Sequence, residues 1–286
     1  MDAAGFGVSE RYLDIGAARE KFLASVAAGP TIMGIVNVTP DSFSDGGLFV
    51  SPGAALAQSR KLVADGAAIV DVGAESTRPG HSPVPADEEW ARLEPLLASL
   101  VSGAGAPVSV DTYKAQTARR ALQTGVAVVN DVWGLQRDPQ MASVVAEAGA
   151  AVVIMHNRES VDPAIDIVSD MQRFFERSLG IARAAGVPER HILLDPGVGF
   201  GKSREQNHQA LAAIPLLARE GFPLLIGVSR KSIFRDLPDG LVEGRLVGTL
   251  AANIFSATLG ARVFRVHDVL EHRAAFTVLA ALQQYL

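Results

Sequence analysis

The sequence predicts an α/β protein that folds as a single (β/α)8 TIM barrel, and three observations support this. Short, almost continuously apolar runs recur along the chain, as expected of parallel strands buried on both faces. Segments with apolar residues at helical spacing separate these runs, so that strand and helix alternate. The runs number eight, as in a closed barrel. The predicted strands cover residues 31–37, 68–73, 108–111, 127–131, 151–156, 192–195, 223–228 and 262–266.

The first segment between two predicted strands illustrates the helical pattern. Pro52 lies near its start, where the fixed φ angle of proline is tolerated, and Gly66 follows its end. Between them, Ala55, Leu62 and Val63 recur at helical spacing. Glycines stand shortly before several strands, as expected of helix C-caps in the left-handed conformation. These glycines are Gly66, Gly125, Gly149, Gly186, Gly221 and Gly260.

The length bounds the domain organisation. The 286 residues would suit two average domains, but (β/α)8 barrels commonly reach this length as one domain. No linker rich in proline, glycine and serine divides the chain. We therefore expect one barrel domain over residues 31–286 and an N-terminal extension, residues 1–30, packed beneath it. A doubly wound open sheet is the alternative architecture.

The composition argues against several classes of protein. The chain has no cysteine, which removes disulfides, zinc–thiolate centres, iron–sulfur clusters and cysteine nucleophiles. Its net charge of -5 argues against a general nucleic-acid-binding protein. The N-terminus lacks the pattern of a signal peptide, and no run of about 18 apolar residues predicts a membrane span. We expect a cytoplasmic enzyme that binds neither nucleic acid nor membranes.

Polar and ionisable side chains follow the predicted strands at the end where barrel enzymes carry their chemistry. One aspartate at a strand end is often only a cap for the next helix, but capping alone does not explain polar residues after all eight strands. We therefore expect an active site at the C-terminal ends of the strands. The residues are Asn37, Asp71, Glu75, Thr77, Arg78, Asp111, Asn130, Asp131, His156, Asp195, Ser229, Arg230, Lys231, Ser232, Arg265 and His267.

The residue types suggest two kinds of binding at this site. The oxygens of Asp111, Asn130 and Asp195 suit a ligand edge that is rich in N–H donors. Positive charges from other strands suit a phosphate or pyrophosphate that is bound with a hard cation. These residues are Arg78, Lys231, Arg265 and His267. The segments 37–47 and 75–85 are rich in glycine, proline and serine, which is typical of loops that close over a substrate.

The motifs at these positions resemble those of the bacterial dihydropteroate synthases, a family of pterin-binding barrels. In chain order they are NVTPDSFSDGG, ESTRPG, SVDTYK, ND, MH, DPGVGFGK, SRKS and RVHDV, and they extend from about residue 31 to residue 268. The first motif is highly specific, and so is SRKS shortly before RVHDV. The resemblance therefore covers most of the chain.

The resemblance implies a transferase of folate biosynthesis that acts with Mg²⁺. Members join 6-hydroxymethyl-7,8-dihydropterin pyrophosphate to p-aminobenzoate, giving 7,8-dihydropteroate and pyrophosphate. They are usually homodimers and are targets of sulfonamides. This chain keeps the ordinary ESTRPG and GFGK forms, which predicts sulfonamide sensitivity. Pyrophosphate departs first, so the site must stabilise charge and exclude water, and an arylamine needs no strong base.

The resemblance also implies a role for each matching residue. The residues that hold the pterin are Asp111, Asn130, Met155, Asp195 and Lys231. The residues on the pyrophosphate side are Asn37, which also binds the metal, Arg78, Arg265 and His267. The residues on the p-aminobenzoate side are Thr77, Arg78, Pro79, Phe200 and Ser232. The residues expected to be catalytic are Asp111, Asp195, Lys231, Arg265 and His267.

Several residues keep a structural interpretation beside the functional one. Asp71 and Glu75 could be structural partners within the barrel mouth, and His156 could be a core histidine. Lys202 could simply cap or solvate a loop, and Asp45 could assist the metal when the first loop closes.

Two alternative functions predict different sets of residues. A corrinoid-dependent methyltransferase acting on methyltetrahydrofolate would share the pterin contacts, but it has no need of the motifs that serve pyrophosphate and an arylamine. A non-catalytic paralogue predicts the loss of Asn37, Lys231, Arg265 or His267, and all four are present.

Overall fold

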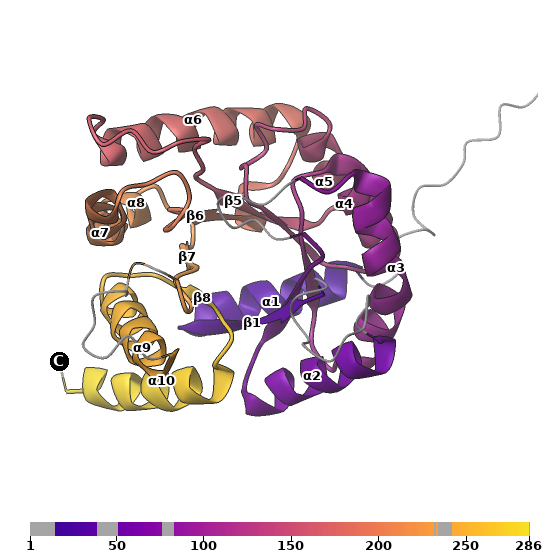
Figure 1. Ribbon diagram of the computed structural model, residues 1–286, viewed down its shortest axis with the longest axis horizontal. Coiled ribbons are helices and arrows are strands. Elements are labelled where there is room, and N and C mark those ends of the chain that lie inside the picture. Colours follow the sequence, from indigo (N-terminus) through magenta and orange to yellow (C-terminus); the bar gives the residue numbers. More distant parts are fainter. Residues whose placement is uncertain (1–14, 39–50, 76–82, 232, 234–241, 286) are drawn as a thin grey trace, which may run out of the picture.

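Eight parallel strands form a barrel with helices around it (Figure 1). The computed structural model describes residues 15–38, 51–75, 83–231, 233 and 242–285. Neighbouring strands follow the order β6-β5-β4-β3-β2-β1-β8-β7. A parallel bridge between Leu194 of β6 and Leu224, just before β7, joins the two ends of this order. The predicted (β/α)8 barrel is therefore confirmed, and the open doubly wound sheet is excluded.

Most strands lie close to their predicted ranges. They are β1 (Thr31–Asn37), β2 (Ile69–Gly73), β3 (Val108–Asp111), β4 (Val128–Asp131), β5 (Ala151–Met155), β6 (Ile192–Asp195), β7 (Leu225–Ile226) and β8 (Val263–Val266). Only β7 is much shorter than predicted. Pro223 has no N–H for the ladder at its start. At its other end, a turn in which Lys231 N–H donates to Val228 O ends the strand.

Ten α-helices are described, and those between two strands lie on the outside of the barrel (Figure 1). They are α1 (Ile15–Ala28), α2 (Pro52–Asp65), α3 (Ala86–Gly103), α4 (Ala115–Gln123), α5 (Met141–Ala148), α6 (Ile167–Ala185), α7 (Arg204–Ala212), α8 (Ile214–Ala218), α9 (Val242–Thr258) and α10 (Val269–Gln283). The start of α2 is as predicted, and Ser51 Oγ caps it by accepting a bond from Ala54 N–H at 3.2 Å. Gly149 and Gly186 end α5 and α6 in the left-handed conformation, as predicted. None of the helices that the structure describes is long and apolar enough to cross a membrane.

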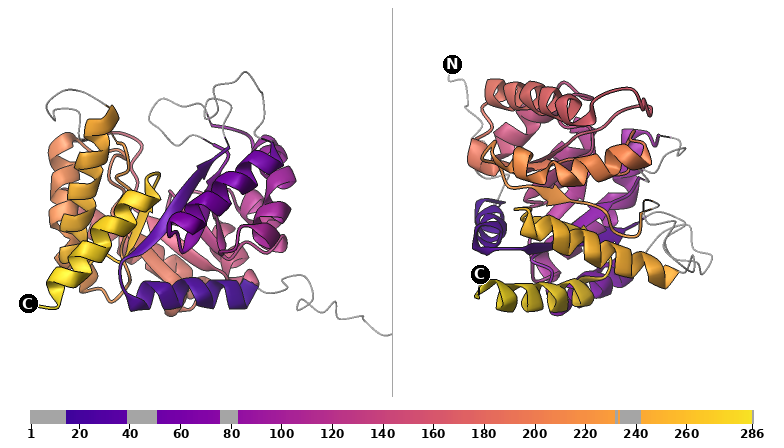
Figure 2. Two further views of the ribbon diagram at one scale, coloured as in Figure 1. Left: turned by 90° about the horizontal axis from the view of Figure 1, so that it is seen from below. Right: turned by 90° about the vertical axis from the view of Figure 1, so that its left-hand side faces the viewer.

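Helix α1 lies across the end of the barrel from which the strands start (Figure 2). Its side chains Ile15, Phe22 and Val26 are buried in the hydrophobic core. Arg19 Nη1 donates to the carbonyl of Gly149, which follows α5. The opposite end of the barrel, where the strands finish, is therefore the one that remains for a binding site.

Candidate active site

Four side chains meet inside the barrel where the strands end. Asp71 on β2 accepts a hydrogen bond from Arg265 Nε on β8 at 2.6 Å and from Asn130 Nδ2 on β4 at 3.3 Å. Arg265 Nη2 donates to Asp111 on β3 at 2.7 Å. Both aspartates and Asn130 are buried. One guanidinium thus links two buried carboxylates, and we call these four residues the acidic recess.

Among the described residues, several hydrogen-bond acceptors in the acidic recess lack a donor. Asp71 Oδ1, Asp111 Oδ1 and Asn130 Oδ1 are buried and have no hydrogen-bond partner within the described part of the chain. A buried acceptor without a partner costs about 1–3 kcal/mol. Three of them in one recess are best satisfied by a ligand that brings several N–H groups.

Burial and the neighbouring charges shift the pKa values in the recess. Burial raises the pKa of Asp111 to about 7, and Asp71 adds to this while Arg265 opposes it. Burial alone would lower the pKa of Arg265, but the carboxylates of Asp71 and Asp111 outweigh it and raise that pKa. Arg265 therefore stays charged, whereas Asp111 titrates near neutrality.

A second group of residues comes from the ends of β6 and β7. Asp195 Oδ1 accepts a hydrogen bond from Gly197 N–H at 2.7 Å. Lys231 Nζ donates to Val198 O and lies 4.3 Å from the centre of the Phe200 ring. Burial lowers the pKa of Lys231 to about 8, against the attraction of Asp195. Burial likewise raises the pKa of Asp195, against the attraction of Lys231.

Charge interactions place the two groups in one site. The ammonium of Lys231 interacts electrostatically with Asp195 and also with Arg265 and Asp111 of the acidic recess. Asp195 in turn acts on Arg265. Met155 is buried at the end of β5, in register with Asp195. The predicted pterin residues therefore lie at one end of the barrel.

Glycines are required in the loop that follows β6. Gly197 has a φ of 65°, and a Cβ there would lie 1.8 Å from the carbonyl oxygen of His156. Gly199 has a φ of 88°, and a Cβ there would lie 3.0 Å from Lys231 Cδ. The spacing in DPGVGFGK thus lets the backbone approach both β5 and Lys231.

The motifs SRKS and RVHDV contact each other at the ends of β7 and β8. Ser229 Oγ lies 2.9 Å from His267 Nδ1 and accepts a bond from His267 N–H at 3.2 Å. Arg230 has a φ of 57° and pairs with Asp268 at the start of α10. The adjacent cations Arg230 and Lys231 therefore have different partners, since Lys231 bonds to Val198 O.

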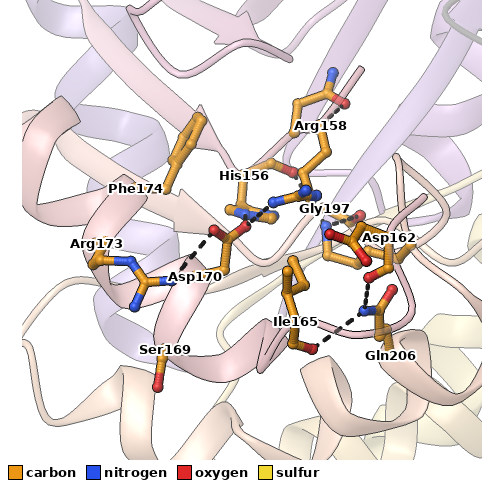
Figure 3. Close-up of polar contacts among 12 residues, drawn as sticks. His156, Arg158, Asp162, Ile165, Ser169, Asp170, Arg173, Phe174, Gly197 and Gln206 are labelled. Carbon is orange, nitrogen blue, oxygen red and sulfur yellow. Dashed lines mark hydrogen bonds and ion pairs between the residues drawn. The ribbon is translucent and has the colours of Figure 1, made fainter. Parts of the chain in front are cut away.

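Three residues with open interpretations now have partners. His156 is fully buried, with Nε2 3.2 Å from Asp170 Oδ2 and its ring edge-on to Phe174, and burial lowers its pKa to about 3 (Figure 3). It is a core histidine. Asp71 belongs to the acidic recess. Glu75 accepts bonds from Tyr113 and Lys114.

The sequence interpretation missed the partners of Glu75. Lys114 also lies 3.2 Å from Glu89 Oε2, and Glu89 is buried and accepts a bond from Thr117 at 2.7 Å. Tyr113 and Lys114 end the motif SVDTYK, and their polarity directly after a strand was the available signal.

Of the remaining predicted residues, some lie within the described part of the chain and others lie outside it. Asn37 is half-buried at the end of β1, in register with Gly73, and Phe200 and His267 are also half-buried. Some predicted residues lie outside the described ranges, and most of the p-aminobenzoate side is among them. These are Asp45, Thr77, Arg78, Pro79 and Ser232.

Asn37, the residue predicted to bind Mg²⁺, offers a single side-chain oxygen at the end of β1. No group of three histidine, aspartate or glutamate side chains that could hold a metal occurs among the described residues. Mg²⁺ commonly takes one or two protein oxygens, water and substrate phosphates. The amide oxygen of Asn37 is a hard ligand of this kind.

Comparisons with known proteins show the family of this chain. The family model described as "Pterin binding enzyme" matches residues 33–267. Dihydropteroate synthase of Bacillus subtilis is 42% identical over 238 residues, covering 83% of each chain.

Two solved structures are similar over most of their length. Dihydropteroate synthase of Xanthomonas albilineans with 4-aminobenzoic acid has a TM-score of 0.85 and 42% identity, covering 89% of this chain and 93% of that one. The Yersinia pestis enzyme in complex with a sulfonamide drug has a TM-score of 0.83 and 36% identity, covering 91% and 96%. The chain therefore belongs to the pterin binding enzyme family and, within it, to the dihydropteroate synthases.

Proposed function

We propose that the acidic recess binds the pterin in the dihydropteroate synthase reaction. One observation carries this assignment: the three buried oxygens of Asp71, Asp111 and Asn130 that lack a partner among the described residues. The edge of a pterin presents several N–H groups and would satisfy them. Asp195 and Lys231 would bind from the β6 and β7 side, and Met155 would pack against the ring.

The cationic residues suit the pyrophosphate. Arg265 carries five N–H donors, more than its two bonds to Asp71 and Asp111 use. Together with His267 it would stabilise the negative charge that develops on the leaving group. Asn37 would hold Mg²⁺, which supplies further positive charge to the pyrophosphate when bound. Arg78, outside the described residues, is proposed for the same side.

The residues of this chain would act mainly through electrostatics. The bond between the pterin methylene carbon and the pyrophosphate oxygen breaks, and its electron pair leaves with pyrophosphate. Asp111 and Asp195 would offset the positive charge that remains on the pterin, and Lys231 would restrain it. The amine of p-aminobenzoate then forms the C–N bond to the methylene carbon and releases a proton. Burial of the recess would exclude water, which competes for the same carbon.

The p-aminobenzoate would lie on the Phe200 side of the site. Phe200 is half-buried and lies beside Lys231. Thr77, Arg78, Pro79 and Ser232 are proposed to complete this side. We propose that sulfonamides compete there with p-aminobenzoate, as the Yersinia pestis complex suggests.

A coupled assay tests the proposed function. Purified chain, Mg²⁺ and the pterin pyrophosphate are combined with and without p-aminobenzoate, and pyrophosphate and 7,8-dihydropteroate are both measured. We expect product formation that a sulfonamide blocks. Pterin binding without product would indicate the non-catalytic paralogue, and methyl transfer from methyltetrahydrofolate to a corrinoid would indicate the methyltransferase.

We further propose that the chain forms a homodimer through α9 and α10, which contact each other (Figure 2). Exposed apolar residues recur every four positions on both helices, so each presents one apolar stripe. They are Val247, Ala251 and Phe255 on α9, and Leu270, Ala274, Val278 and Leu282 on α10. Phe255 is 50% exposed and Val278 60% exposed, which favours burial against a second copy.

Sedimentation tests the dimer. We expect wild type to sediment as a dimer and Phe255→Glu with Val278→Lys to sediment as a folded monomer. A wild-type monomer, or a double variant that remains dimeric, would show that these stripes are not the interface.

A further inference from the structure

Lys202 is a buried lysine at the end of the loop that follows β6. The whole residue is only 6% exposed, and such deep burial is rare for lysine. The ammonium donates to the carbonyl oxygens of Gly197 at 2.8 Å, Phe200 at 3.2 Å and His156 at 3.4 Å. Lysine has three N–H donors, so three carbonyls match its full capacity. Lys202 therefore bonds to the backbone of its own loop and to the end of β5.

The three carbonyls belong to segments that hold functional residues. Gly197 N–H donates to Asp195 Oδ1, and Gly197 O also accepts a bond from Phe200 N–H at 3.1 Å. Phe200 packs beside Lys231, whose ammonium donates to Val198 O. A shift of the loop would therefore move Phe200 and would disturb Asp195 and Lys231 as well.

Asn207 on α7 is another side chain that bonds to the backbone of this loop. Its Oδ1 accepts a bond from Gly199 N–H at 2.6 Å, and its Nδ2 donates to Ser203 O at 2.9 Å. Asn207 thus anchors the middle of the loop from outside the barrel. Among the described side chains, only Lys202 bonds to Gly197, to Phe200 and to His156, the residue that follows β5, so Lys202 and Asn207 are not redundant. We call these three bonds of Lys202 the clamp.

We propose that Lys202 is a positioning residue that fixes Phe200 and Gly197 against the end of β5, and thereby aligns the p-aminobenzoate side of the site with the pterin side. This inference rests on the proposed function. Lys202 acts through the loop and is not assigned any contact with substrate. In this role its positive charge matters, because a charged donor bonds a carbonyl more strongly than a neutral amine.

The surroundings of Lys202 link this role to pH. Burial lowers the pKa of Lys202 to about 7, and Asp195 is the strongest opposing influence. We therefore expect the clamp to weaken as the pH rises through this range. The charged groups around Lys202 come from several elements. Figure 3 shows two of them, where Arg158 Nη1 donates to Asp170 at 2.7 Å. The charged groups that act on Lys202 are Asp195 on β6, Lys231 after β7, Asp170 on α6 and Arg158 after β5.

The test compares Lys202→Met with Lys61→Met, the same substitution at a lysine whose side chain is 72% exposed on α2. We expect Lys202→Met to raise the KM for p-aminobenzoate about tenfold, because small displacements of binding groups cost one to two orders of magnitude. The decline of wild-type kcat/KM with rising pH should be flatter in this variant. Lys61→Met should behave as wild type. Unchanged KM and an unchanged pH profile in Lys202→Met would overturn the proposal.

A readout that needs no substrate separates this proposal from the proposed function. We expect hydrogen exchange at the amides of Phe200 and Gly199 to be faster in Lys202→Met than in wild type. If wild type makes no dihydropteroate but the exchange difference is present, the proposed function fails while the clamp stands. If wild type is active and exchange is unchanged, the clamp fails.

A second variant covers the case in which Lys202→Met does not fold. Lys202→Arg keeps a permanent charge, so its activity should not decline through the titration of this residue. Assignment of the Lys202 side chain by NMR in wild type gives its pKa directly. A wild-type pKa near the ordinary value for lysine, together with an Arg variant that has the wild-type pH profile, would overturn the role of its charge.

Discussion

The two ends of the barrel are made of the same eight strands, yet they bury different kinds of side chain. At the start of the strands, α1 covers the barrel with apolar side chains, and Phe22 is fully buried. At the other end, Asp71, Asp111 and Asp195 are also buried, but each is a carboxylate. Burial lowers the free energy of an apolar side chain and raises that of a charge. The difference fits a stabilising role for α1 and the binding role that we propose for the acidic recess.

The largest expected effect comes from breaking the apolar end. Phe22→Ala would remove a fully buried ring and lower the free energy of unfolding by about 3–5 kcal/mol. Urea unfolding measures this, and kcat and KM of the folded variant should match wild type. Lys21→Ala, on the exposed side of α1, is the control. A large loss of kcat in folded Phe22→Ala would contradict the separation of the two ends.

The next effect comes from the charged end. Asp195→Ala should weaken binding of the pterin pyrophosphate about a hundredfold, because hydrogen bonds to charged groups are worth about 1.5–3 kcal/mol. Its melting temperature should stay close to that of wild type, since a buried carboxylate with a raised pKa is removed. Calorimetric titration gives the affinity. Wild-type affinity in this variant would show that the pterin binds elsewhere.

A smaller effect is expected at Asp71, which bonds Arg265 and Asn130. Asp71→Asn keeps the shape but removes the charge that orients the guanidinium, and we expect kcat/KM to fall about tenfold. Asp87→Asn, at a side chain that is 78% exposed, is the control. Equal activity in both variants would leave Asp71 without a role in orienting Arg265.

The smallest effect, when counted for a single pH unit, is the pH dependence of stability that Asp111 contributes. Its pKa is raised from 3.8 to about 7 on folding, mainly by burial. Between these values the folded state binds more protons, so this contribution to stability is full below pH 3.8 and is lost as the pH rises through 7. The loss should stay under about 1.4 kcal/mol per pH unit. Urea unfolding of wild type and of Asp111→Asn at several pH values measures this loss. If the free energy of unfolding changes equally with pH in both proteins, the prediction is wrong.

Much of the fold was predictable because parallel strands in a barrel are buried on both faces and are therefore apolar throughout. The range of β7 was not predictable. Its start depends on the lack of an N–H at Pro223, and its end depends on the turn at Val228–Lys231. A turn of this kind is set by tertiary packing as much as by residue type. The apolar run alone therefore predicted too long a strand.

The sequence predicted which residue types stand at the strand ends. It did not predict which of these side chains bond to each other. Arg230 and Lys231 are adjacent cations, yet Arg230 pairs with Asp268 and Lys231 bonds to Val198 O. Lysine is usually exposed, so the burial of Lys202 was unexpected from its type. The pairing of Arg265 with Asp71 joins residues that are 194 positions apart in the chain, and no local pattern indicates it.

That pairing has a consequence for how the protein is made. Asp71 and Arg265 are 194 residues apart, and β1 also pairs with β8. On the ribosome, β1 and β2 emerge long before β8. The edge of β1 that pairs with β8 therefore stays unpaired while most of the chain is synthesised. Contacts this distant in sequence slow folding. Catalytic activity would therefore arise only after the last strand is released, and a chain truncated before β8 would be inactive and prone to aggregate through its open edge.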